Sequence, residues 1–344
     1  MDLWSRLDAA VDRAPSVAAL HHHRLHLYAA WRWRSAGRTI PPELAALERG
    51  AATLRMGLAA MASYVRHAVD GPVVLLKGAD VAALYPRPEL RPSGDLDVLV
   101  ADAAQAYRAL LRSGFREDEA TPQTPTAHHH LAPLLWPGLA GRVELHSAPN
   151  WPLWLAPPPA SEIIEAASGR SQAGDGILAL SPAHRTAVLV AHLWRENPLG
   201  RLGQLLDVIL SASHADPDAI AETMRRWRLE RLWATTLAVA SQIFADRSEQ
   251  RRARFLSRPL RALHERSALE AKVAEAVAPF YGLRPPHSIV ASGATVTRWL
   301  RPDQNETWRD KMRRTLKMTK QLASPVSIFV RRWEDEHRRR PPGG

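Results

Sequence analysis

Two aspartates separated by one residue follow a loop in the first half of the chain. Asp95 and Asp97 begin the run Asp-Leu-Asp-Val-Leu-Val, whose apolar residues predict a β-strand over residues 95–100. Because side chains alternate along a strand, both carboxylates are expected to point from one face. Two carboxylates this close repel each other, so the pair favours a bound divalent cation.

A third carboxylate occurs in a similar setting further along the chain. Residues 142–146, Arg-Val-Glu-Leu-His, alternate in polarity and predict another strand, on which Glu144 and His146 share a face. If this strand lay beside the one with the aspartates, Glu144 could complete a site for two metals. Mg²⁺ or Mn²⁺ suits such oxygen ligands, and a metal pair can stabilise both oxygens of an in-line phosphoryl displacement. For His146, substrate orientation, base catalysis and simple packing all remain open.

The residues just before the aspartates have the chemistry of phosphate contacts. An apolar, β-branched run at 73–76 predicts a buried strand, and Lys77 and Gly78 follow it before a short predicted helix. A glycine at such a turn lets backbone approach a phosphate, and Lys77 would add a positive charge. Arg91 and Ser93, in the Pro-rich loop that follows, are further candidates.

Several short motifs occur in a fixed order between about residues 70 and 215. They are Leu-Lys-Gly-Ala at 76–79, Tyr-Pro at 85–86, Arg91, Asp-Leu-Asp-Val-Leu-Val at 95–100, Val-Glu-Leu-His at 143–146, His184, His192 and Arg-Leu-Gly-Gln-Leu-Leu-Asp at 201–207. As a set, they resemble the bacterial nucleotidyltransferase family related to DNA polymerase beta. The likeness is strongest to its uncharacterised branch, in which Leu-Lys-Gly precedes Asp-x-Asp.

This resemblance implies an α+β fold, with a polymerase-beta-like core around a small mixed sheet, N-terminal helices and a C-terminal helical domain. It implies metal-dependent transfer of NMP from ATP or another NTP to an acceptor, which could be a small molecule, a peptide or protein, or an RNA end. The catalytic metal ligands would be Asp95, Asp97 and Glu144. The nucleotide contacts would be Lys77, Gly78, Arg91, Ser93 and His146.

The chain departs from the pattern of the wider superfamily at the glycine turn. Most members have Gly-Ser there, and the serine hydroxyl meets a phosphate, whereas Gly78 is followed by Ala79. The separation of Gly78 from Asp95, 17 positions, is also long. Both features weaken the expected grip on the triphosphate, for which Lys77 would have to compensate.

Two other functions therefore remain open. An Asp-x-Asp after an apolar strand also serves glycosyltransferases, where a metal holds the diphosphate of a sugar nucleotide. The Lys-Gly turn so close upstream argues against that alternative. The missing serine leaves room for a non-catalytic nucleotide sensor or a toxin–antitoxin component.

Composition and length predict a globular protein with several regions. Of the 344 residues, 46% are hydrophobic and none is cysteine, which excludes disulfides and thiolate chemistry. Without a signal-peptide pattern or a membrane-length apolar run, we expect a cytoplasmic protein with no stable membrane insertion. Helical and breaker patterns predict an N-terminal helical region (1–70), the catalytic core (71–160), a helical domain (161–297) and a basic amphipathic segment with a tail (298–344).

Positive charge is concentrated in the last third of the chain. Residues 221–344 carry 26 Lys+Arg and 13 Asp+Glu, whereas the rest has a net charge of −2. Trp308, Met312 and Leu316 lie at helical spacing among basic residues, which predicts docking on the protein, gathering of an acidic acceptor, or contact with an anionic membrane. The histidine triplets at 21–23 and 128–130 are expected on a loop or helix surface rather than at a metal, because consecutive side chains diverge.

Overall fold

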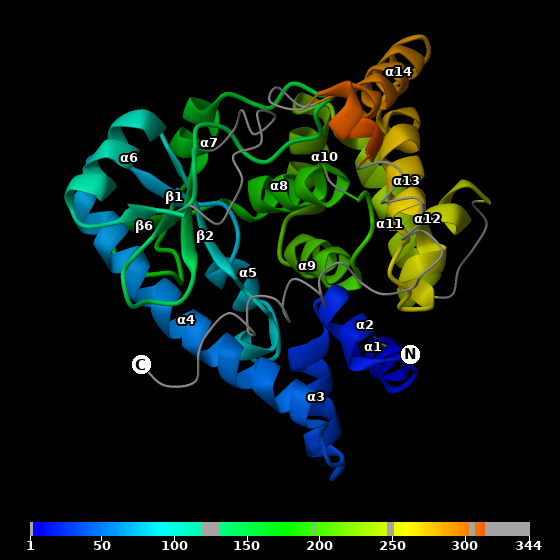
Figure 1. Ribbon diagram of the computed structural model, residues 1–344, viewed down its shortest axis with the longest axis horizontal. Coiled ribbons are helices and arrows are strands. Elements are labelled where there is room, and N and C mark those ends of the chain that lie inside the picture. The colour runs from blue at the N-terminus through cyan, green and yellow to red at the C-terminus, as the bar shows by residue number, and fades with distance from the viewer. Residues whose placement is uncertain (1–2, 119–130, 196, 246–250, 303–306, 314–344) are drawn as a thin grey trace.

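The computed structural model describes residues 3–118, 131–195, 197–245, 251–302 and 307–313 (Figure 1). Within these residues the chain forms helices and a six-stranded sheet. The helices are α1 (Leu3–Asp12), α2 (Val17–His22), α3 (His26–Ser35), α4 (Pro42–Ala68), α5 (Ala79–Ala82), the 3₁₀ helix η1 (Pro88–Leu90), α6 (Ala103–Arg112), α7 (Ala160–Ala166), α8 (Pro182–Arg195), α9 (Leu202–Ser213), α10 (Pro217–Arg226), α11 (Glu230–Phe244), α12 (Arg251–Arg261), α13 (Ala268–Gly282) and α14 (His287–Leu300). The strands are β1 (Val73–Leu75), β2 (Asp95–Val100), β3 (Arg116–Glu117), β4 (Leu134–Leu135), β5 (Arg142–His146) and β6 (Ile177–Ala179).

The sheet is mixed and has the order β3-β4-β5-β2-β1-β6. The central strand β2 pairs antiparallel with β1 and parallel with β5, and β1 pairs parallel with β6. The three strands expected from the sequence are confirmed, as is the α+β fold class. The β2–β5 register places Asp97 beside Glu144, so the strand that carries the third carboxylate is adjacent to the one that carries the aspartates.

The two faces of the sheet meet different surroundings. Leu96, Val98 and Val100 of β2 point into an apolar core that also contains Met61 of α4 and Leu110 of α6. The opposite face joins the core of the helical half, α8 to α11, which lies beside the sheet in Figure 1. Strand alternation places the two aspartates of β2 on that second face.

The helices α1 to α4, which precede β1, contribute to both cores. Leu20 and Tyr28, from α2 and α3, are buried in the core of the helical half. Met61 and Val65, from the long helix α4, pack instead against the sheet. The turn between α3 and α4 therefore marks where the N-terminal region passes from one core to the other.

Short polar side chains set where several of these helices begin. Asp102 accepts a hydrogen bond from the Gln105 amide (2.8 Å) and so caps α6. The expected helix start at Ser181-Pro182 is confirmed, since Pro182 is the first residue of α8. Ser267 and Glu270 form a reciprocal capping box at the start of α13.

Two expectations met a different outcome. His23 is completely buried rather than on the surface, because its ring packs between α2 and the start of α9. The side chains of Trp308 and Met312 are 64% and 62% exposed, so the described part of the amphipathic segment is not docked through them. The triplet at 128–130 and Leu316 lie outside the described residues. Among the helices of the described ranges, none has the length and apolarity to cross a membrane.

Candidate active site

Acidic side chains from neighbouring strands converge on the face of the sheet that meets the helical half. Asp97 of β2 is 3% exposed, and its Oδ1 lies 3.1 Å from Nε2 of His146 on β5. The same ring nitrogen is 3.8 Å from Oε2 of Glu144. His146 is itself buried, so it lies beneath the carboxylates and can donate a hydrogen bond to Asp97 in any protonation state that keeps the Nε2 proton.

Lys77 lies directly against both aspartates. Its Nζ is 3.3 Å from Oδ2 of Asp95 and 3.0 Å from Oδ2 of Asp97. The ammonium thus occupies the position of a counter-cation between the two carboxylates. The sequence placed Lys77 near the phosphates, and in the structure its charge is directed to the aspartates.

The electrostatics of this group show strong crowding of negative charge. Burial, together with Asp97 and Asp95, raises the pKa of Glu144 to about 7. Burial opposes the ionisation of Asp97, but Lys77 and His146 outweigh it and hold its pKa well below the usual range. Burial likewise disfavours the charged form of Lys77, yet the two aspartates raise its pKa above the ordinary value.

The acidic group has the donors that a divalent cation requires. Ligand atoms of Asp97, Glu144 and His146 lie within 4.8 Å of one another, and no other such group of three occurs among the residues that the structure describes. Oδ2 of Asp97 is buried and meets the Lys77 ammonium as an ion pair at 3.0 Å. An oxygen already paired with a cation and the raised pKa of Glu144 fit a site for a hard cation such as Mg²⁺ or Mn²⁺.

The turn after β1 has the backbone freedom expected of it. Gly78 has φ +90°, a backbone conformation that residues with a Cβ rarely adopt. A Cβ at this position would meet no atom within 4 Å. The space above this peptide is therefore open to a ligand. Ala79, where most superfamily members have serine, begins the short helix α5.

Arg91 and Ser93 are placed differently from the other predicted phosphate contacts. The guanidinium of Arg91 is buried and makes two hydrogen bonds of 2.9 Å to the carboxylate of Asp207 on α9. Tyr85 donates to the same carboxylate at 2.8 Å. Arg91 also donates to Ser93 Oγ (3.0 Å) and to the Gly78 carbonyl (3.3 Å). The charge of Arg91 is thus used to join the sheet to α9.

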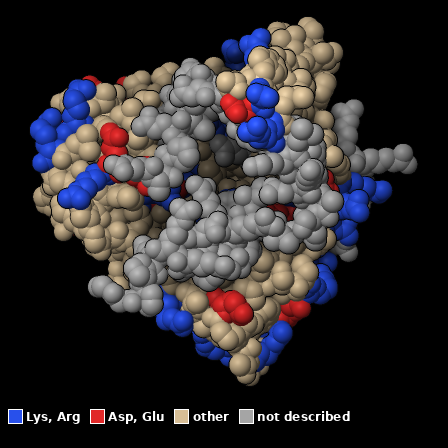
Figure 2. Space-filling model, in the orientation of Figure 1, with Lys and Arg blue, Asp and Glu red and all other residues tan. Residues whose placement is uncertain are grey.

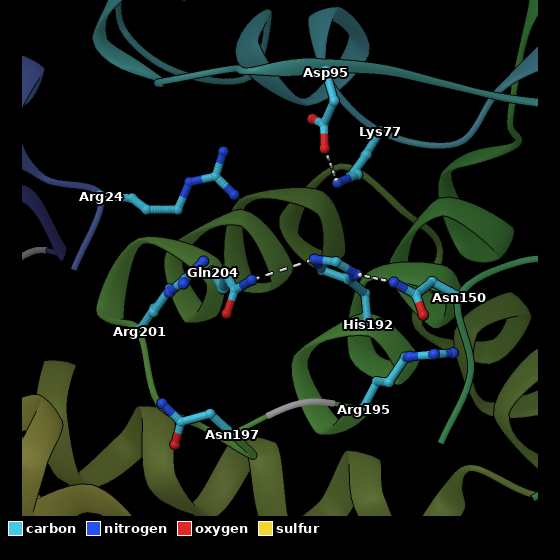
Figure 3. A pocket seen from close by; sticks show the side chains of 9 residues that line it. All are labelled: Arg24, Lys77, Asp95, Asn150, His192, Arg195, Asn197, Arg201 and Gln204. Atoms are coloured by element: carbon cyan, nitrogen blue, oxygen red, sulfur yellow. Dashed lines mark hydrogen bonds and ion pairs between the residues drawn. The ribbon is translucent and has the colours of Figure 1, made fainter. Parts of the chain in front are cut away.

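A cavity of about 250 Å³ opens beside Lys77 and Asp95, between the sheet and the helical half. The space-filling view shows a hollow between these two halves (Figure 2). Four cations and one acid line the cavity, together with neutral polar side chains (Figure 3). The complete lining is Arg24, Lys77, Asp95, Asn150, His192, Arg195, Asn197, Arg201 and Gln204.

Hydrogen bonds fix the positions of several side chains that line the cavity. His192 of α8 lies between two amide side chains, with Nδ1 3.3 Å from Asn150 and Nε2 3.2 Å from Gln204 (Figure 3). Burial and the nearby Lys77 keep the pKa of His192 well below its ordinary value, so the ring is neutral. Arg24, from the turn between α2 and α3, donates to the Pro92 carbonyl at 2.9 Å. Neutral donors and fixed cations therefore face the same space.

Sequence reasoning found the acids but few of the cavity residues. His192 and Arg201 stand within the motifs that carry the resemblance, although no role was predicted for them. Arg195 is the last residue of α8. Asn197 comes from the Pro/Gly-containing connection between α8 and α9, a pattern that predicts a loop but no ligand. Arg24 follows the histidine triplet, and nothing near it in the sequence indicates its position opposite Lys77.

Comparison with known proteins is consistent with this architecture. A family model described as an uncharacterised nucleotidyltransferase matches residues 10–245, more than half of the chain, and the chain belongs to that family. It is therefore an enzyme of the nucleotidyltransferase class. The matched span contains the acidic residues and the entire cavity lining. A search of curated proteins gave no significant match.

Proposed function

We propose that the enzyme transfers an NMP from an NTP to an acceptor in a reaction that depends on divalent metal. Asp95, Asp97 and Glu144 are assigned as the metal ligands. The observation that carries this proposal is the meeting of the acidic group with a cavity lined by four cations. A cation that neutralises the carboxylates and cations that bind polyphosphate are both needed where an NTP reacts.

A bound divalent metal would supply charge neutralisation between the carboxylates and the reacting phosphate. The other roles belong to side chains of the protein. His146 holds the Asp97 carboxylate through the contact at 3.1 Å. Lys77 neutralises the aspartates in the structure, and a divalent cation held by Asp95, Asp97 and Glu144 would take over that role. The Lys77 ammonium lines the cavity, where a phosphate oxygen could then replace a carboxylate as its partner.

The cavity cations are assigned to the triphosphate. Arg24, Arg195 and Arg201 come from three different segments and surround the space next to Lys77 (Figure 3). Guanidinium groups suit this task because their planar N–H donors match phosphate oxygens. The open space above Gly78 allows a phosphate to approach the backbone there as well. Arg91 supports this arrangement indirectly, through Asp207 of α9.

The residues that line the cavity also bear on how a nucleotide base could be recognised. It consists of charged and amide or imidazole side chains, with no Trp, Tyr or Phe among the nine. Base recognition by stacking on an aromatic ring therefore has no support from this cavity. We propose that the acceptor, which can be a small molecule, a peptide or an RNA end, approaches the acidic side of the site.

The proposal is tested with base-labelled NTPs, Mg²⁺ or Mn²⁺, and cell extract as the source of acceptor. We expect metal-dependent release of pyrophosphate with transfer of label to a component of the extract. The Asp95→Ala, Asp97→Ala double variant should abolish both. Transfer that persists in this variant would overturn the site assignment. NTP binding without any release of pyrophosphate would instead indicate a sensor, and tighter metal-dependent binding of a UDP-sugar would indicate glycosyl transfer.

A further inference from the structure

The connection between α8 and α9 is a tightly bent segment that contributes to the cavity from two positions. Asn197 and Arg201 both line the cavity, and the residues between them turn the chain. Asn197 and Leu199 have φ values of +48° and +52°, in the left-handed region that residues with a Cβ disfavour. A Cβ on Gly200 would lie 2.3 Å from the Asn197 side chain. Such a turn needs outside contacts to keep this shape.

Arg266 supplies those contacts from the other side of the turn. Its Nη1 donates to the Pro198 carbonyl at 2.5 Å and to Oδ1 of Asn197 at 2.9 Å. Its Nη2 donates to the Leu199 carbonyl at 3.4 Å and, also at 3.4 Å, to the Leu256 carbonyl of α12. One planar guanidinium thus binds three consecutive residues of the turn and ties them to the neighbouring helix.

Arg266 is a charged side chain whose burial is energetically unfavourable. The residue is 7% exposed, and burial lowers its pKa to about 10. The four oxygens that it binds belong to three carbonyls and one amide, so each satisfies the guanidinium without neutralising it. Arg266 also lies just before the N-cap of α13, beyond residue 245, where the match to the family ends. The segment that follows the matched span thereby contacts the turn that lines the cavity.

We propose that Arg266 is a positioning residue for the polyphosphate cavity, a role that rests on the proposed function. Arg266 fixes the Asn197 side chain and the main-chain carbonyls of Pro198 and Leu199, so that Asn197 and Arg201 face the cavity. The far end of the segment is fixed separately, since His23 Nδ1 accepts from the Leu202 amide at 3.2 Å. Loss of the guanidinium fork should leave the acidic group intact and loosen only the part of the cavity that this segment provides.

The test measures binding of inorganic tripolyphosphate by calorimetry in the absence of metal, so that neither a base nor a metal ion contributes. Arg266→Lys keeps the charge and loses the fork. We expect it to weaken tripolyphosphate binding roughly tenfold, the usual order for loss of a residue that orients a ligand-binding group. Binding of Mn²⁺ alone, followed by electron paramagnetic resonance, should not change. The matched control is Arg185→Lys, another buried arginine of the helical half, which donates to Ser211 outside the cavity.

A double-mutant cycle separates positioning from general loss of stability. Arg201→Ala removes a cavity cation on the segment itself. If Arg266 acts through this segment, Arg266→Lys should have much less effect in the Arg201→Ala background than in the unaltered protein. Fully additive losses would overturn the proposal, because they would show that Arg266 does not position Arg201.

A second variant tests the same segment without altering Arg266, in case Arg266→Lys does not fold. Gly200→Ala forces the turn apart, and we expect it also to weaken tripolyphosphate binding while Mn²⁺ binding is kept. Unchanged tripolyphosphate binding in Gly200→Ala or in folded Arg266→Lys would overturn the positioning role and leave the proposed function in place. A failure of the unaltered protein to bind tripolyphosphate or NTP would overturn the proposed function itself.

Discussion

The acidic group and the cationic cavity lie side by side but are built in different ways. Asp97, Glu144 and His146 come from two adjacent parallel strands, whose ladder fixes their spacing. The cavity cations come from separate segments, and Arg24 and Arg201 stand at turns between helices. The acids are therefore positioned by main-chain hydrogen bonds, and the cations by the packing of helices. Damage to the helical half should weaken the binding of phosphate while the metal site remains.

Polar contacts buried between the sheet and the helical half connect the two regions. Asp207 binds Arg91 and Tyr85 of the sheet half and stands on α9, the helix that also carries Gln204 of the cavity. The following predictions separate the two regions, or test their connection, in order of decreasing effect.

The largest effect is expected for Asp97→Ala. We expect NMP transfer to fall by roughly a thousandfold, since metal stabilisation of transition-state charge is worth several kcal/mol. Pyrophosphate release measures this loss, and metal-free tripolyphosphate binding should be kept. The control is Asp102→Asn, which alters the capping residue of α6 and conserves its capping ability. Loss of tripolyphosphate binding in Asp97→Ala would show that the two regions are not separable.

Asp207→Asn tests the connection between the two halves. It leaves the Arg91 charge buried without its carboxylate, so the free energy of unfolding should fall by about 3–5 kcal/mol. Urea denaturation followed by circular dichroism measures the change. The control is Glu222→Gln, which breaks an exposed pair with Arg225 and should leave the denaturation midpoint almost unchanged. An equally small effect of both variants would contradict the structural role assigned to Arg91.

His23 predicts a pH dependence of stability. Burial and His22 lower its pKa from 6.5 to about 3, so the folded protein keeps the ring neutral. Between these two values the unfolded chain binds the proton and the folded chain does not, so stability falls as the pH falls below 6.5. From pH 7 to pH 5 the loss due to His23 is about 2 kcal/mol. The free energy of unfolding of His23→Gln, measured by denaturation at several pH values, should depend less on pH than that of the control His287→Gln, an exposed position. Equal dependence on pH in both variants would show that His23 is not the cause.

The smallest effect is expected when one cavity cation is removed. Arg24→Ala should raise the Kd for NTP about tenfold, as expected for loss of one charge-assisted hydrogen bond. Calorimetry measures this change, and Mn²⁺ binding without nucleotide should be unaffected. Arg225→Ala, which removes an exposed arginine of α10, serves as the control. Weaker Mn²⁺ binding in Arg24→Ala would indicate that this arginine supports the acids as well.

The acidic half of the site could be predicted because its information is local. Alternation in the runs that contain Asp95 and Glu144 predicts strands and the faces of their side chains. Apolar runs and capping residues likewise predicted three of the strands and helix starts such as that of α8. The strand β6 was not predicted, since its three residues join the sheet only by pairing with β1.

Tertiary structure decided the rest. The adjacency of β2 and β5, which brings Glu144 to Asp97, depends on pairing between segments more than 40 residues apart. Whether an arginine meets a phosphate or a carboxylate depends on what lies opposite it. Arg91 was predicted to contact the phosphates, but it binds the carboxylate of Asp207, 116 positions further along the chain. Arg24 lines the cavity although nothing in the sequence indicates it. Strand periodicity is a property of neighbouring residues and can be found in the sequence, but a partner brought by helix packing is known only once the chain has folded.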